Sequence, residues 1–210
     1  MTIQVQNVTK AIRGITVLQN VSLTLESGII YGLRGVNGSG KTMLMRLLAG
    51  LIRPTSGRVL LDGKVLGREI SFPPDMGMLI ENPAFLDGYT AAQNLRFLAD
   101  IRKKVGEDRI QQVLTEVGLE YGDKRKYRQF SLGMKQRLGI AGAVLEHPQL
   151  LLIDEPTNAL DTDGIDMVQS LLLKEKERGA LVVLACHDFP ILQKMSDVLY
   201  SVREGRVEPL

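Results

Sequence analysis

Residues 35–42 read GVNGSGKT, a run in which glycines, a lysine and a threonine are spaced for phosphate chemistry. The glycines let the backbone bend so that successive N–H groups point at phosphate oxygens, and a following helix adds its positive end. The lysine places a point charge on the outer phosphates, and the threonine hydroxyl can bind Mg²⁺. This spacing is the P-loop pattern of nucleotide-binding sites. The predicted phosphate-binding residues are Gly35, Val36, Asn37, Gly38, Ser39, Gly40, Lys41 and Thr42.

Two carboxylates follow the apolar run at 150–153, in the segment LLLIDEP. A buried strand that ends here would place Asp154 beside the P-loop, where it can hold a metal ion through water. Glu155 would then lie next to it, able to orient and deprotonate an attacking water molecule. Acidic residues at strand ends are common, so this pair indicates a catalytic site only in combination with the P-loop. Together they predict a Mg²⁺-dependent enzyme that hydrolyses a nucleoside triphosphate.

His187 follows another apolar run, ALVVLAC at 180–186. If that run is a strand of the same sheet, His187 lies at its carboxyl end and can contact the γ-phosphate; a purely structural histidine is the alternative. His147 receives no role. Cys186 is the single cysteine, so no internal disulfide can form and a reducing compartment is indicated. We interpret it as a buried strand residue and not as a reactive thiol.

The segment YRQFSLGMKQR, at 127–137, has a small hydroxyl and a glycine where a helix is expected to begin. Ser131 and the amide of Gly133 would form a second anion site at the positive end of that helix. Taken alone, the same residues are equally consistent with an ordinary helix cap. The P-loop is far away in the sequence, so these residues alone do not show which phosphate group the segment would bind.

Along its whole length the chain resembles the ATP-binding subunit of an ABC transporter. The segments quoted above correspond to that family's Walker A loop, Walker B strand with catalytic Glu155, and switch His187; NALD at 158–161, with Asp161, corresponds to its D-loop. The resemblance implies that two subunits pair head to tail and enclose ATP between the Walker A loop of one and the signature segment of the other. The signature residues implied to contact nucleotide are Phe130, Ser131, Leu132, Gly133 and Met134.

The chain departs from the family pattern at several positions. Leu132 stands where the signature usually has glycine, and Met134 takes its fifth place. Ile12 occupies the position of the aromatic residue that normally stacks on adenine, so a flat apolar contact remains and adenine preference is expected to be loose.

Glu81, in LIENPAF at 79–85, stands where the family usually has a glutamine that contacts Mg²⁺. A carboxylate about 4 Å from a phosphate oxygen costs about 4 kcal/mol at an effective dielectric constant near 20, unless a metal or a proton offsets it. We therefore predict that Glu81 joins Thr42 and Asp154 as a Mg²⁺ ligand, with a solvated loop glutamate as the alternative. This glutamate, together with SLGMKQRLGIA at 131–141, makes the chain resemble the subgroup tied to export of, and immunity to, bacitracin and lantibiotic peptides.

The expected elements form an α/β P-loop NTPase core with a mixed sheet. Apolar strands at 28–34, 149–154 and 180–186 each precede helical sequence, which is typical of parallel sheets. Val21, Leu23 and Leu25 alternate with polar residues, and Asp62-Gly63 predicts a hairpin turn, so an N-terminal antiparallel β subdomain is expected. A second hairpin turns near Glu204-Gly205 and closes the chain.

Residues 85–148 have helical periodicity and predict an inserted α-helical subdomain. Thr90 and Gln93 form a capping box, and Leu95, Leu98 and Ile101 repeat at helical spacing, which we interpret as a core-facing stripe. Further helices are expected over 110–117 and from 132 to about 144. The chain is thus interpreted as one ABC ATPase domain over 1–210, with its nucleotide-binding core and β subdomain at 1–84 and 149–210.

Composition limits the partners. The net charge of +2 gives no field suited to nucleic acid, and no apolar run approaches the roughly 20 residues of a membrane span. The resemblance implies an integral membrane permease and a second ATP-binding subunit, identical or a sister chain, at the cytoplasmic face of the membrane. The alternatives are a soluble ABC-type ATPase with a regulatory or assembly role and, with less support, a generic P-loop kinase. Cargo and direction of transport are not readable from these residues.

Overall fold

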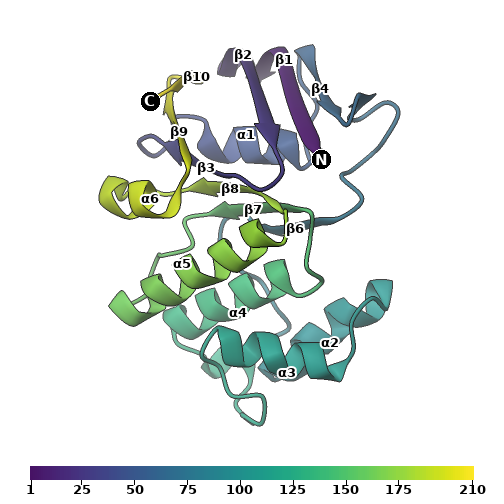
Figure 1. The fold of residues 1–210 in the computed structure, drawn as a ribbon, viewed down its shortest axis with the longest axis vertical. Helices are drawn as coiled ribbons and strands as arrows, with labels where there is room; N and C mark the ends of the chain where they lie inside the picture. Colours follow the sequence, from purple (N-terminus) through teal and green to yellow (C-terminus); the bar gives the residue numbers. More distant parts are fainter.

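The computed structural model describes all 210 residues, which fold into two sheets and a group of helices (Figure 1). In the view of Figure 1 the smaller sheet lies at the top and the larger sheet in the middle, with helix α1 between them. Helices α4 and α5 cover the other face of the larger sheet, and α2 and α3 lie farthest from the smaller sheet. This arrangement confirms the predicted fold class.

The smaller sheet has the order β2-β1-β4-β5 and is antiparallel throughout. Its burial pattern confirms the predicted alternation, because Val21, Leu23 and Leu25 are buried and the residues between them are exposed. Asp62 and Gly63 have φ values of 47° and 81°, which suit the tight hairpin between β4 and β5. The strands are β1 (Thr2–Ile12), β2 (Ile15–Glu26), β4 (Ser56–Leu61) and β5 (Lys64–Val65).

The larger sheet has the order β10-β9-β3-β8-β7-β6, parallel except where β10 pairs with β9. All residues of β7 and β8 are buried, as expected for parallel strands covered on both faces. The strands are β3 (Ile30–Arg34), β6 (Met76–Leu79), β7 (Leu150–Asp154), β8 (Leu181–Ala185), β9 (Val198–Arg203) and β10 (Arg206–Pro209).

Four of the six α-helices begin at a residue whose side chain caps them, and α1 and α3 begin after a glycine. Thr90 and Gln93 make the predicted capping box of α2, and Ser131 and Asp161 cap α4 and α5. The helices are α1 (Lys41–Leu48), α2 (Ala91–Arg102), α3 (Glu107–Glu116), α4 (Leu132–Val144), α5 (Thr162–Glu177) and α6 (Phe189–Met195), with a 3₁₀ turn at Tyr127–Gln129.

Two hydrophobic clusters lie on opposite sides of the larger sheet. One, of 23 buried residues, joins α1 to both sheets; the other, of 30 buried residues, runs from β7 and β8 through α4 and α5 into α2 and α3. The second cluster crosses the predicted boundaries of the 85–148 insert, so the division of the chain stays an interpretation. Side chains pack across those boundaries as in a single core.

One predicted core stripe is wrong in part. Leu95 is fully buried, but Leu98 is 38 % exposed and Ile101 is 77 % exposed. Helical periodicity identifies an apolar face without showing whether another element covers it. The end of α2 leaves part of its apolar face open to solvent.

Candidate functional site

The P-loop connects β3 to α1 and wraps around the first turn of that helix. Gly40 has φ of 115°, and a Cβ at this position would lie 2.9 Å from the carbonyl oxygen of Val17, so only glycine fits. The Lys41 ammonium donates hydrogen bonds to the carbonyl oxygens of Gly35 and Val36, at 2.7 and 3.2 Å. The Ser39 hydroxyl is buried and has no partner. The loop thus offers an unused donor to a ligand.

The C-terminal hairpin holds the P-loop from behind. The Gly205 amide, in the turn between β9 and β10, donates to the carbonyl oxygen of Ser39 at 2.9 Å. The Gly205 carbonyl accepts from the amide of Gln19, at 2.8 Å. The turn therefore ties the loop to β2 of the smaller sheet.

Asp154, at the end of β7, lies beside the start of α1. The Thr42 hydroxyl donates to its Oδ2 at 2.5 Å, which joins the two predicted metal ligands. Burial raises the pKa of the Asp154 carboxyl, while the bond from Thr42 acts in the opposite direction. Carboxylate and hydroxyl oxygens are the donors that Mg²⁺ prefers, so this pair fits the ion.

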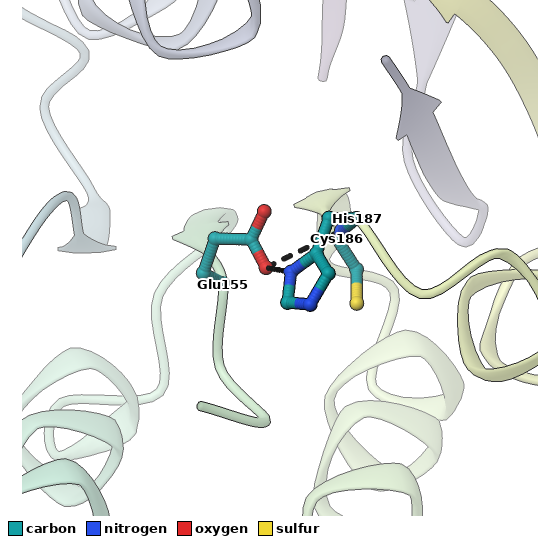
Figure 2. A group of neighbouring side chains, drawn as sticks. All are labelled: Glu155, Cys186 and His187. Carbon is teal, nitrogen blue, oxygen red and sulfur yellow. Dashed lines mark hydrogen bonds and ion pairs between the residues drawn. The ribbon is translucent and has the colours of Figure 1, made fainter. Parts of the chain in front are cut away.

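Glu155 and His187 face each other across the carboxyl ends of β7 and β8 (Figure 2). The Glu155 Oε2 lies 2.8 Å from His187 Nδ1 and accepts from the His187 backbone amide at 3.3 Å. Glu155 has φ of 51°, a left-handed conformation that non-glycine residues adopt rarely and that recurs at functional sites. The structure thus brings together the two residues predicted to act on water and on the γ-phosphate. Cys186 is buried beside them, as predicted, although it lies one residue beyond the end of β8.

Gln136 belongs to this site but was missed in the sequence analysis. It is 7 % exposed on α4, and its side-chain amide donates to the backbone carbonyl of Glu155 at 3.0 Å. The helix that begins with the signature segment is therefore bonded to the segment that carries Glu155. A polar residue at a buried helical position was the available signal, and only the fold identifies its partner.

Two cavities flank the P-loop. One, of about 480 Å³, lies between the loop and the β1–β2 hairpin and is lined by Ile12, Ile15, Lys41 and Thr42 among others. The other, of about 630 Å³, lies on the far side of the loop and includes His187. No residue of 130–134 lines either cavity. The predicted signature contacts are therefore separate from the P-loop of their own chain.

The signature segment forms the exposed start of α4. The Ser131 hydroxyl accepts from the amide of Met134 at 3.2 Å, and Leu132 is 75 % exposed. A Cβ on Gly133 would lie 2.8 Å from the carbonyl oxygen of Ala159, so the signature segment and the D-loop pack closely. Both segments present polar groups on the same part of the surface.

Phe130 and Asp161, two residues predicted to contact nucleotide, make contacts within their own chain. Phe130 is buried against Tyr127 in the helical core, and a contact with nucleotide stays a prediction for this residue. Asp161 caps α5 by accepting from the amide of Gly164 at 3.0 Å, and it pairs with Arg137 at 3.4 Å. Its side chain is 73 % exposed and remains accessible from solvent.

Glu81 follows β6 and forms an ion pair with Arg46 of α1. Its side chain is 61 % exposed, against 31 % for Arg46, and its φ of 65° is again left-handed. Arg46 lies one helical turn after Thr42, so the pair connects the end of β6 to the helix that follows the P-loop. In this structure the Glu81 carboxylate therefore pairs with the Arg46 guanidinium, and its role as a Mg²⁺ ligand stays a prediction.

The fold, the phosphate loop and the paired acidic strand end define a nucleotide-hydrolysing ATPase of the ABC cassette class. The ABC transporter family profile matches residues 18–158, and the chain belongs to that family. It is an ATP-binding and ATP-hydrolysing subunit of an ABC transporter.

Several known proteins are similar over nearly the whole chain. The uncharacterized ABC transporter ATP-binding protein YybJ of Bacillus subtilis is 47 % identical over 98 % of this chain and 94 % of its own length. The bacitracin transport ATP-binding protein BcrA of Enterococcus faecalis is 37 % identical over 98 % of this chain and 67 % of its own length. The lantibiotic transport ATP-binding protein SrtF of Streptococcus pyogenes is 35 % identical over 98 % of this chain and 88 % of its own length.

Solved structures show the same architecture. An ATP-binding subunit of an ABC transporter superposes with a TM-score of 0.89 at 26 % identity, covering 99 % of this chain and 88 % of the other. A dimeric ATP-binding cassette in a post-hydrolysis state, bound to ADP and phosphate, superposes with a TM-score of 0.86 at 25 % identity, covering 98 % of this chain and 96 % of the other.

Proposed function

We propose that the working ATPase is a head-to-tail pair of cassettes that encloses ATP between the P-loop of one and the signature segment of the other. The observation that carries this proposal is the separation of two anion-binding features within one chain. The P-loop cavities include no residue of 130–134, while Ser131 caps an exposed helix end. A second subunit, identical or a sister chain, supplies the missing half. The dimeric cassette among the similar structures supports this arrangement.

In each composite site we assign Lys41 and the P-loop amides to the phosphates, and Ile12 to the base. Glu155 accepts the proton of the attacking water, and His187 fixes the orientation of that carboxylate and contacts the γ-phosphate. Their 2.8 Å contact supports this pairing.

Thr42, Asp154 and Glu81 would hold Mg²⁺, which neutralises charge on the phosphates when bound. To serve as a ligand, Glu81 must first leave Arg46. The ion pair holds Glu81 near the P-loop helix, so the residue is placed to respond to a change at the end of β6.

A separate membrane permease is the proposed docking partner, which would place the chain peripherally at the cytoplasmic face of the membrane. None of the chain's helices has the length and apolar character of a bilayer span. A cavity of about 330 Å³ lies between β6 and the helical insert, lined largely by apolar residues. Apolar side chains on β6 and on the insert are also exposed: Met78, Leu86, Tyr89, Phe97, Leu98 and Ile101. An apolar helical segment of a permease suits such a surface.

The proposed cargo class is a peptide antibiotic, with transport conferring export or immunity. Support comes from the similarity to BcrA and SrtF, whose names specify bacitracin and lantibiotic transport. The glutamate at position 81 supports the same subgroup.

The composite site is tested by measuring ATPase activity of the isolated chain against protein concentration. The specific activity should rise with concentration because two chains form each site. Glu155→Gln should bind ATP, stop turnover and accumulate as a dimer in size-exclusion chromatography. Full specific activity in a solution dilute enough to be monomeric contradicts the proposal.

Copurification in mild detergent tests the transport role. A membrane protein should be retained with the wild-type chain, and the cells that lose this chain should become more sensitive to bacitracin or a lantibiotic. Recovery of the chain only in the fraction without membranes would support the regulatory or assembly role instead.

A further inference from the structure

Three side chains that can bind a metal ion lie together where β7 and β8 end. Glu155, Cys186 and His187 each present one potential ligand atom, and these atoms all lie within 4.8 Å of one another. Figure 2 shows the carboxylate and the imidazole ring facing each other, with the Cys186 sulfur beyond the ring in this view. We call these residues the Glu155–Cys186–His187 cluster. It combines an oxygen, a sulfur and a nitrogen donor.

This donor set differs from the one that suits Mg²⁺. Mg²⁺ takes oxygen ligands in octahedral geometry, whereas thiolate and imidazole ligands favour Zn²⁺. Asp154 and Thr42 form an oxygen pair, and the cluster is a separate set of mixed donors. Three protein ligands and one open position form a common zinc arrangement.

Small side-chain movements would bring the three ligand atoms to the distances of a tetrahedral zinc site. Zn–S bonds of about 2.3 Å and Zn–N and Zn–O bonds of about 2.0–2.2 Å place tetrahedral ligands roughly 3.3–3.7 Å apart. The Glu155–His187 contact of 2.8 Å would open slightly, and the sulfur would move closer by about 1.2 Å at most. His187 has a side chain that is 62 % exposed, so an ion can approach from solvent while Cys186 stays buried behind it.

We propose that the Glu155–Cys186–His187 cluster binds Zn²⁺ through a carboxylate oxygen, the thiolate and one imidazole nitrogen, and that bound Zn²⁺ stops ATP hydrolysis. The thiol releases its proton to solvent when the metal binds. The inhibitory part rests on the proposed function, because a metal-bound Glu155 cannot accept a proton from water and a metal-bound His187 cannot contact the γ-phosphate. Zinc binding and ATP hydrolysis therefore exclude each other at one site.

Cobalt binding to the nucleotide-free protein tests the site directly. Co²⁺ replaces Zn²⁺ in such sites and gives a thiolate-to-metal charge-transfer absorption that oxygen and nitrogen ligands do not give. The chain has one cysteine, so this absorption can arise only from Cys186. The titration, in a non-thiol reductant, should produce the band in wild type and not in Cys186→Ser, and added Zn²⁺ should remove it. A folded wild-type protein without the band at saturating Co²⁺ overturns the proposed site.

Zinc inhibition of ATPase tests the consequence. Cys186→Ser should raise the Zn²⁺ concentration for half-inhibition by about 10-fold or more, with circular dichroism and activity without zinc matching wild type. Equal inhibition of both proteins would mean that zinc acts through the nucleotide, and it overturns the inhibitory part. Glu155→Gln separates the two proposals: it should abolish turnover and keep a weakened cobalt band. If this variant hydrolyses ATP at the wild-type rate, the assigned role of Glu155 fails while the cobalt result still decides the metal site.

Discussion

The ion pair between Arg46 and Glu81 makes a quantitative prediction about Mg²⁺ dependence. Glu81 must leave Arg46 to become a metal ligand. The free energy of the ion pair therefore opposes metal binding by Glu81. The side chains are 31 % and 61 % exposed, so solvent screening limits the pair to about 0.2–1 kcal/mol. Each 1.4 kcal/mol is a factor of about ten, so removing the pair should shift the equilibrium by up to about 5-fold.

Arg46→Ala should therefore lower the Mg²⁺ concentration for half-maximal ATP binding by up to about 5-fold. The assay is titration of a fluorescent ATP analogue against Mg²⁺ in a Glu155→Gln background, where turnover does not interfere. Steady-state ATPase against Mg²⁺ in the otherwise wild-type chain gives a second readout. High salt should reduce the difference because it screens exposed charges.

Two matched variants make the reasoning refutable. Arg46→Lys keeps the positive charge and should remain close to wild type. Glu81→Gln should change the Mg²⁺ dependence by itself, and adding Arg46→Ala to it should have no further effect. If Arg46→Ala shifts the Mg²⁺ dependence equally with and without the Glu81 carboxylate, the arginine acts elsewhere. If Glu81→Gln alters neither Mg²⁺ dependence nor rate in the assembled transporter, Glu81 is a solvated loop residue.

The buried positions and one exposed ion pair give further predictions. Gln136→Ala removes one of two hydrogen bonds to the Glu155 carbonyl, which still accepts from the Asn158 amide. It should lower the free energy of unfolding by about 0.5–1.5 kcal/mol in a denaturant titration, and should also reduce ATPase activity. Leu95→Ala should cost about 2–5 kcal/mol in the same assay, whereas Ile101→Ala should stay within about 0.5 kcal/mol. Arg96 and Tyr121 lower the pKa of Glu107 from 4.5 to about 2 through side-chain hydrogen bonds, so this group stabilises the fold above pH 4.5 and loses that contribution as the pH falls toward 2. The stability difference between wild type and Glu107→Gln, about 1 kcal/mol or less at neutral pH because the pair is exposed, should shrink over this range in chemical denaturation. A cost for Ile101→Ala equal to that of Leu95→Ala, or a pH-independent difference for Glu107→Gln, would contradict these assignments.

Local features of the fold were predictable from short stretches of sequence. The capping box of Thr90 and Gln93, the hairpin at Asp62-Gly63 and the P-loop all depend on residues close together in the chain. The start of α4 at Leu132 followed from the capping hydroxyl of Ser131. Such features are determined by backbone conformation and hydrogen bonds over a few residues.

Features that depend on packing between distant segments were not predictable. Leu98 and Ile101 have the periodicity of a core stripe, yet Leu98 is only partly covered by α4 and Ile101 is largely exposed. Phe130 sits within a motif implied to bind nucleotide, but its ring completes the helical core. The bond from Gln136 to Glu155 and the ion pair from Arg46 to Glu81 each join residues far apart in sequence, so no local pattern encodes them.

The bond between the Gly205 amide and the Ser39 carbonyl has a consequence for synthesis of the protein. A ribosome completes the phosphate loop at residues 35–42 long before it reaches the turn at Gly205 that holds the loop. A nascent chain can form β3 and α1 well before that brace exists. The phosphate loop therefore lacks this brace until the β9–β10 hairpin has been translated and has folded against it.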